Sequence, residues 1–306
     1  MAWTLRCNIQ CHRNGGFILH PDLLAGGIAS STGSLTRSAR RRPALLQFRQ
    51  ALTPLTRSSL GVTGVLLFLA AWQMTGLSGL WPRALFPPPT DVMQALHELF
   101  STRDFGMDVL ASLRRVGLSF LLAGMLALPL GILMGAFSPI AALLNPLVAA
   151  FRYLPATAFI PLFLMWLGAG EEQKIALLII GVVFFLITLL MDNTCAVRAE
   201  LIETARTLGA GRRRILWSVV VRASLPAYVD TLRQMLAVSW TYLVVAEIVA
   251  STDGIGAMMM RAKRFVHVDE IMAGIVVIGA LGLLFDGLFR ALHWWAFPYL
   301  RHSRGH

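Results

Sequence analysis

The chain has 306 residues, of which 56% are hydrophobic and only 14% are charged, and its mean hydropathy is +0.66. A soluble globular domain carries about 25% charged residues. The apolar residues here stand in long charge-free blocks, so the composition excludes a soluble domain and indicates a bilayer environment. The net charge of +11 does not indicate nucleic-acid binding, because the arginines flank the apolar blocks.

Residues 1–57 hold eight arginines and one acidic residue, Asp22, and contain no long apolar run. This composition predicts a basic, disordered tail, although an organellar transit peptide or a start assigned too far upstream would give the same pattern. Cys7-x-x-x-Cys11-His12 lacks a second pair of metal ligands, so we interpret it as incidental. The last arginines of the tail precede the first apolar block, where a cytoplasmic flank is expected.

The first apolar block, residues 58–82, fits one crossing, since about 20 residues span a bilayer. In the connector that follows, the prolines at 87–89 cannot continue a helix, and we expect Thr90 or Asp91 to cap a short amphipathic one. The apolar face of that helix comprises Val92, Ala95, Leu96 and Leu99.

Residues 116–151 carry no charge, and these 36 residues are too many for one crossing. We expect Pro139 and Pro146 to divide the block, and Pro155 and Pro161 to kink the span that follows. The six predicted spans are 58–82, 110–135, 145–167, 175–196, 227–250 and 270–292. The predicted fold class is therefore an all-α integral membrane protein with six transmembrane helices.

Basic residues gather on one side of these six spans. The arginines of the tail, of residues 198–222 and of residues 290–304 all fall on that side, and far fewer fall on the other. The positive-inside rule therefore predicts that both termini and the polar segment 198–217 lie in the cytoplasm.

The polar segment 198–217 separates the fourth and fifth predicted spans. Leu201, Ala205 and Leu208 follow one another at i, i+4 and i+7, which places them on one face of a short helix. Gly209 suits the C-terminal turn of that helix, and Ile215 belongs to a second helix that leads back to the membrane. Two short helices around a glycine turn predict a compact element on which a soluble partner docks.

Glu203-Thr-Ala205-x-x-x-Gly209 resembles the EAA loop of permease subunits in bacterial ATP-binding-cassette (ABC) importers. Residues 151–171, Leu243–Glu247 and Gly254–Gly256 resemble the nitrate/sulfonate/taurine/bicarbonate branch of that family, in register and in order.

The chain departs from the family pattern at two places. Thr204 replaces an alanine, and Val221-Arg222 stands where the family has Leu-Pro. A Leu225-Pro226 pair follows four residues later. We therefore expect the second helix of the polar segment to run on to Leu225-Pro226 before it turns into the membrane.

The resemblance implies a type I ABC importer permease core, in which segment 198–217 is the coupling loop. The residues implied to couple the permease to a cytoplasmic ATPase are Leu201, Glu203, Ala205, Leu208 and Gly209. The chain has no Gly-x-x-x-x-Gly-Lys-[Ser/Thr] phosphate loop, so we expect it not to be an enzyme. No cofactor is expected in this chain, and a separate ATPase subunit would bind ATP and Mg²⁺.

Further partners implied by the resemblance are an extracytoplasmic substrate-binding protein, a second permease copy in a homodimer, and membrane lipid, with no nucleic acid. The implied location is the bacterial plasma (inner) membrane, with several crossings. The implied layout is a tail at 1–57, a first helix with an extracytoplasmic connector at 58–107, a five-helix ABC transmembrane type-1 domain at 108–296, and a tail at 297–306.

The implied function is ATP-driven import of a small organic or inorganic anion of the sulfonate, taurine, nitrate or bicarbonate type. Two alternatives belong to other classes, an ion-coupled secondary carrier and an integral-membrane enzyme. The sequence favours neither, because it shows no internal repeat and no constellation of catalytic groups near one membrane face.

Two ionisable residues within the predicted spans, Arg152 and Glu247, are candidates for the translocation path, because charges at membrane depth usually face a cavity or a partner. A guanidinium at residue 152 suits an oxoanion. The structural alternative is that Arg152 pairs with Glu247 or Asp286, or donates to a backbone carbonyl. At the start of the second span, Arg114 and Arg115 include at least one residue expected at the interface.

Overall fold

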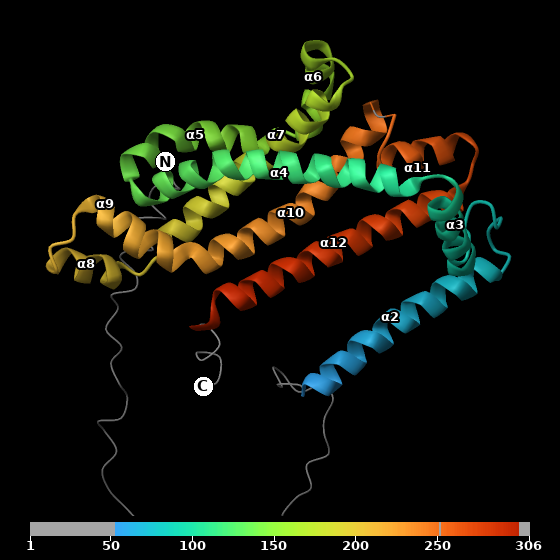
Figure 1. The fold of residues 1–306 in the computed structure, drawn as a ribbon, viewed down its shortest axis with the longest axis horizontal. Helices are drawn as coiled ribbons and strands as arrows, with labels where there is room; N and C mark the ends of the chain where they lie inside the picture. Colours follow the sequence, from blue (N-terminus) through green and yellow to red (C-terminus); the bar gives the residue numbers. More distant parts are fainter. Residues whose placement is uncertain (1–52, 251, 300–306) are drawn as a thin grey trace, which may run out of the picture. The chain divides into compact units, whose positions relative to one another are not determined.

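The computed structural model describes residues 53–250 and 252–299, and these residues form helices joined by short connections (Figure 1). The chain divides into two units, residues 1–71 and residues 72–306. The long helices are α2 (Pro54–Leu77), α4 (Phe105–Ala136), α7 (Glu171–Cys195), α10 (Arg222–Ala250) and α12 (Val268–Ala296). The shorter helices are α3 (Pro89–Thr102), α5 (Ser138–Tyr153), α6 (Ile160–Leu167), α8 (Ala199–Thr207), α9 (Arg212–Ile215) and α11 (Ile255–Arg264).

The prediction of six spans is consistent with these helices. Five helical stretches are long and apolar enough to cross a membrane, and the bent pair α5–α6 makes a sixth if it counts as one span. The ends of the helices differ from the predicted limits by a few residues, because hydropathy marks the apolar stretch and not the polar turns that extend it. The predicted tail, 1–57, lies almost wholly outside the described residues.

The packing of α4 on α7 forms the centre of the second unit. Gly131 and Gly135 lie one turn apart on α4, so the α7 backbone comes very close to this face. A Cβ atom at Gly135 would lie only 2.4 Å from Cβ of Thr194. Small residues that allow two backbones to approach are the usual basis of helix packing in membranes, where no hydrophobic force drives the helices together.

The third span differs from its prediction. Pro146 lies inside α5 and does not divide the apolar block, and the break falls instead at Phe137, whose backbone is extended. The expected kink is present, since the helix axes on either side of residues 154–155 differ by 86°. Leu154 precedes Pro155 and is extended, as the proline ring requires of the residue before it.

The expected amphipathic helix is α3, and Val92, Ala95 and Leu99 are buried on its inner face. Its predicted cap was wrong. The helix begins at Pro89, with Pro88 as an extended N-cap that makes no side-chain hydrogen bond. Proline fits the first turn because the amide that it lacks would have no partner there.

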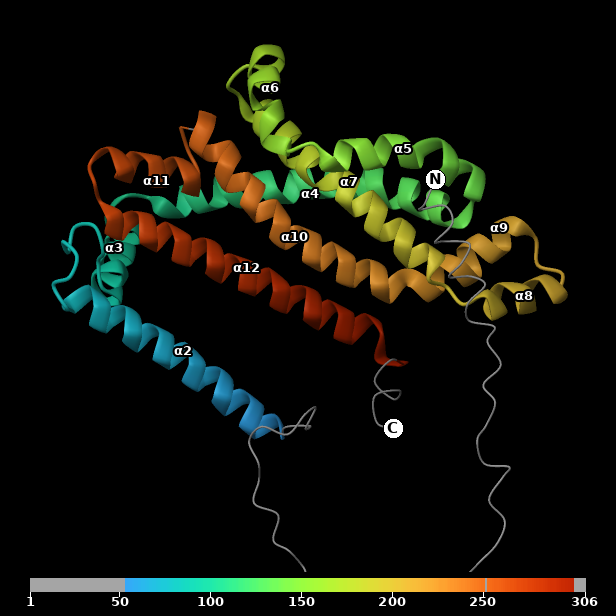
Figure 2. The same ribbon diagram turned by 180° about the vertical axis from the view of Figure 1, so that it is seen from behind.

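The second unit has two distinct ends. Figures 1 and 2 both show α8 and α9 at one end of the long helices α4, α7 and α10, with α3 and α11 at the other. We refer to these as the α8 end and the α11 end.

Candidate functional site

The predicted coupling element is an exposed helix at the α8 end. None of the residues of α8 is buried. Leu201, Glu203 and Leu208 are all exposed, and Leu208 exposes 82% of its surface. An apolar residue so open on a polar segment outside the apolar spans suits contact with a protein partner.

Gly209 ends α8 in the manner expected. Its φ of +78° is left-handed, a conformation that glycine adopts without a Cβ penalty. The amide of Ala210 donates to the carbonyl of Ala205 at 3.0 Å, and the amide of Gly209 donates to that of Arg206 at 2.9 Å. This pair of hydrogen bonds is the Schellman motif. It turns the chain sharply and keeps α8 and α9 as two separate short helices.

The second helix of the element continues into the membrane without the expected turn. From α9 the chain passes through a π-helical segment, Leu216–Val221, directly into α10, and Pro226 lies inside α10. The expectation of a turn at Leu225-Pro226 was therefore wrong. Within the described residues, α9 and α10 therefore form one uninterrupted helical stretch, Arg212–Val249.

Glu247 lies in the last turn of α10, fully buried, and its partner is Arg115. The two charged groups meet at 2.7 Å, and the side chain of Arg115 is only 2% exposed. The acids considered as partners of Arg152 have other cations beside them: Glu247 pairs with Arg115, and Asp286 also lies 3.5 Å from Arg233. Asp286 pairs with Arg290 at 2.7 Å, and Arg152 lies 5.4 Å from the ring centre of Tyr153.

Arg115 joins four segments of the chain. Besides Glu247 of α10, it binds Glu171 of α7 at 2.7 Å and the side chain of Asp253 at 2.9 Å. It also donates to the backbone carbonyl of Asp253 at 2.9 Å. A buried guanidinium is costly unless its donors are satisfied, and here carboxylates and a carbonyl satisfy them.

The same network holds the start of α11. The amide of Gly256 donates to Glu247 at 2.8 Å, and the amide of Ile255 donates to the hydroxyl of Ser112 at 3.0 Å. Ser112 in turn donates to Glu247 at 2.7 Å. A carboxylate that accepts from the first amides of a helix also complements the helix dipole. We call Ser112, Arg115, Glu247 and the Asp253–Gly256 backbone the buried clasp.

Sequence reasoning missed the buried clasp. Arg115 was considered only as an interfacial residue, and Gly254-Ile-Gly256 only as part of a family resemblance. The available signal in the sequence was Gly254 itself. The structure shows why glycine stands there: its φ of +106° is left-handed, and a Cβ would lie 2.4 Å from Oε1 of Glu247.

Outside the spans, one ion pair orders the start of α3. Arg83 binds both carboxylate oxygens of Asp91 at 2.8 Å. The hydrogen bonds from this guanidinium lower the pKa of Asp91 from its ordinary value, and the carboxylate raises the pKa of Arg83. The bidentate pair fixes the connector to the helix that follows it.

Comparisons with known proteins agree with this architecture. The family model described as "Binding-protein-dependent transport system inner membrane component" matches residues 127–295. The taurine transport system permease protein TauC of Escherichia coli is 33% identical over 63% of this chain and 71% of its own length. The bicarbonate transport system permease protein CmpB of Synechococcus elongatus is 28% identical over 66% of this chain and 75% of its own length.

The solved structures add the fold. The MetNI methionine ABC transporter in an inward-facing conformation matches with a TM-score of 0.53 and 19% identity, over 62% of this chain and 98% of that chain. The family model covers more than half of the sequence, and the helices follow the same architecture. The chain therefore belongs to the inner-membrane permease components of binding-protein-dependent ABC transport systems.

Proposed function

We propose that this permease imports a small organic or inorganic anion of the sulfonate, taurine, nitrate or bicarbonate type, driven by a separate ATPase. The observation that carries the coupling proposal is α8, an exposed helix ended by the Schellman turn at Gly209. The anion class is supported by relatives whose names specify taurine and bicarbonate.

In the proposed orientation the α8 end and both termini are cytoplasmic, and the α11 end is extracytoplasmic. The concentration of arginines on the side of the α8 end supports this orientation. The ATPase binds ATP and Mg²⁺, since this chain has no phosphate loop. Residues Leu201, Glu203, Ala205, Leu208 and Gly209 form the ATPase contact.

Two permease copies line one path, and each docks an ATPase through its coupling element. Closure of the ATPases on ATP moves the two α8 helices, and α9 passes the movement into α10 because the helix is continuous. The binding protein delivers solute at the α11 end, and hydrolysis resets the pair. The cycle is a population shift between two states that nucleotide and loaded binding protein bias from opposite ends.

The test is co-purification of the permease with its ATPase, followed by Glu203→Lys. Glu203 is exposed on α8, so charge reversal there leaves packing intact and removes a contact only if the ATPase lies against it. We expect loss of solute-stimulated ATP hydrolysis at normal expression. Unchanged assembly and hydrolysis would remove the coupling assignment.

For the path we propose that Arg152 contacts the anion, at the end of α5 next to the 86° bend. Glu247 acts differently, because the buried clasp encloses its carboxylate completely, so it positions the chain around the end of the path. Uptake of radiolabelled taurine and bicarbonate by an assembled Arg152→Gln variant tests the first role, and normal uptake of both argues against it.

A further inference from the structure

The last turn of α11 carries an unusual charge for its position. Arg261, Lys263 and Arg264 lie within four residues at the α11 end. In the proposed orientation this end is extracytoplasmic, where short loops are poor in Lys and Arg. Within the described residues Arg261 has an acidic partner, whereas no ion pair involves Lys263 or Arg264. The positive-inside rule therefore does not account for these charges.

The chain beyond this turn exposes apolar groups. Phe265 exposes 73% of its surface, and Val266 is also exposed. Val266 has a left-handed φ of +59°, which is rare for a β-branched side chain and indicates strain. We call residues 261–267 the basic knob. It places a phenylalanine and a valine directly beside three cations.

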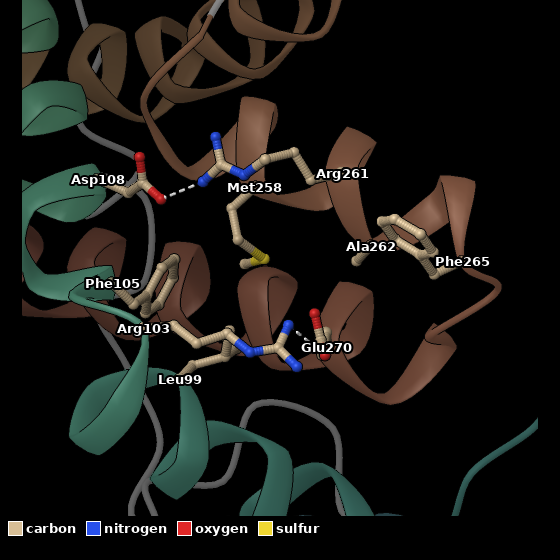
Figure 3. Close-up of a pocket in the computed structure, with 9 residues that line it drawn as sticks. All are labelled: Leu99, Arg103, Phe105, Asp108, Met258, Arg261, Ala262, Phe265 and Glu270. Carbon is tan, nitrogen blue, oxygen red and sulfur yellow. Dashed lines mark hydrogen bonds and ion pairs between the residues drawn. The ribbon is translucent and has the colours of Figure 1, made fainter.

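A cavity of about 210 Å³ adjoins the basic knob (Figure 3). Leu99, Phe105 and Met258 supply its apolar wall. Two ion pairs cross its rim, Arg103 with Glu270 at 2.9 Å and Arg261 with Asp108 at 2.5 Å.

The charges at the rim are not evenly exposed. The side chain of Arg103 is 53% exposed and that of its partner Glu270 only 11%. The other pair is arranged in the same way, with an exposed Arg261 and a largely buried Asp108. Each guanidinium is therefore more exposed than its carboxylate, and Lys263 and Arg264 add two exposed cations nearby.

We propose that the basic knob and the adjoining cavity form the docking surface for an acidic face of the extracytoplasmic binding protein; this rests on the proposed function. The cavity is smaller than the roughly 300–1,000 Å³ of small-molecule sites, so it suits one protruding side chain of a protein. Exposed cations next to the exposed Phe265 and Val266 match an interface that combines charge steering with an apolar contact.

This surface is mechanically connected to the rest of the permease. The guanidinium of Arg261 binds Asp108 of α4 and the carbonyl of Thr252 at 2.6 Å. The other end of α11 is held by the buried clasp, which includes Glu247 of α10. A protein bound at the basic knob is therefore connected to α4 and α10 through direct contacts of α11, and α10 continues to the coupling element.

The experiment uses the complete transporter with its ATPase in nanodiscs, and measures association of its purified binding protein. The variant Lys263→Glu/Arg264→Glu reverses two charges that make no ion pair with described residues, so it breaks no ion pair among them. We expect association to slow by about tenfold or more at low salt, with a weaker salt dependence than wild type. Basal ATP hydrolysis remains unchanged, and its stimulation by the binding protein is lost.

Arg114→Glu is the matched control, because Arg114 is an exposed cation on α4 outside the basic knob and the cavity lining, and no ion pair involves it within the described residues. It should leave association unchanged. Equal association of wild type and the double variant would overturn the proposed docking surface and leave the proposed function standing. If the double variant keeps normal association with the binding protein but loses binding to anionic lipid vesicles, the surface contacts lipid and the docking proposal is overturned. A wild-type complex that recruits no ATPase and no binding protein would overturn the proposed function itself.

Discussion

Replacing Gly209 by alanine tests the coupling element with little steric interference. A Cβ at this position meets no atom within 4 Å, so the substitution changes only the backbone preference. Holding a non-glycine residue at φ of +78° costs about 1–2 kcal/mol. A cost of that size lowers the population of the native turn about 5- to 30-fold relative to its alternatives.

We expect Gly209→Ala to reduce solute-stimulated ATP hydrolysis by at most that factor, while the membrane-embedded helices stay folded. Gly209→Asn should retain more activity, because asparagine tolerates the left-handed conformation better than alanine. Gly168→Ala controls for strain in general, since Gly168 has a φ of +72° and open surroundings but lies in a different turn.

The assay is ATP hydrolysis by the reconstituted complex, with thermal unfolding measured in parallel. Gly168→Ala should lower the unfolding temperature and leave the ratio of stimulated to basal hydrolysis intact. If Gly209→Ala and Gly168→Ala lower that ratio equally, the turn at Gly209 has no special part in coupling and the reasoning is refuted.

Three further predictions concern stability. Glu247→Gln leaves its buried guanidinium partner undercompensated and should destabilise the fold by about 3–5 kcal/mol in denaturant unfolding; a change under 1 kcal/mol would contradict a structural clasp. Gly135→Ala should lower the free energy of unfolding by about 1–3 kcal/mol, because the added Cβ overpacks the contact with α7. Gly117→Ala on the same helix meets open space and should be neutral or stabilising. Thermal unfolding of the two variants measures the difference. The pKa of Asp91 is lowered in the folded state, so the stabilisation of the connector by the Asp91–Arg83 pair is complete above the unfolded pKa and is lost as the pH falls through the folded pKa. Proteolysis of the connector as a function of pH should therefore rise on the acid side in the wild type but not in Arg83→Gln. Identical pH profiles for the two proteins would contradict this prediction.

The sequence predicted the parts of this fold that depend on local properties. A charge-free stretch of about 20 residues is apolar wherever it lies, so the spans could be located before any packing was known. The turn at Gly209 was equally local, because residues 205–210 make both of its hydrogen bonds. The kink after Tyr153 followed from the proline at 155.

Other local inferences failed where packing overrides propensity. Pro146 was expected to break a helix and lies inside α5, and Leu225-Pro226 was expected to turn the chain and lies inside α10. Proline is tolerated in membrane helices because neighbouring groups satisfy the carbonyl that it leaves without a donor. Whether they do so depends on the surrounding structure.

Composition and local pattern thus determined the class of protein, the spans and the two short helices of segment 198–217. Only the tertiary structure decided which charges meet. Arg115 and Glu247 are 132 residues apart, and neither has a pattern that names the other. A buried charge requires a partner, but the partner is chosen by which helices pack together. The buried clasp, and its connection through α11 to the basic knob, therefore emerged only when α4, α7 and α10 were in place.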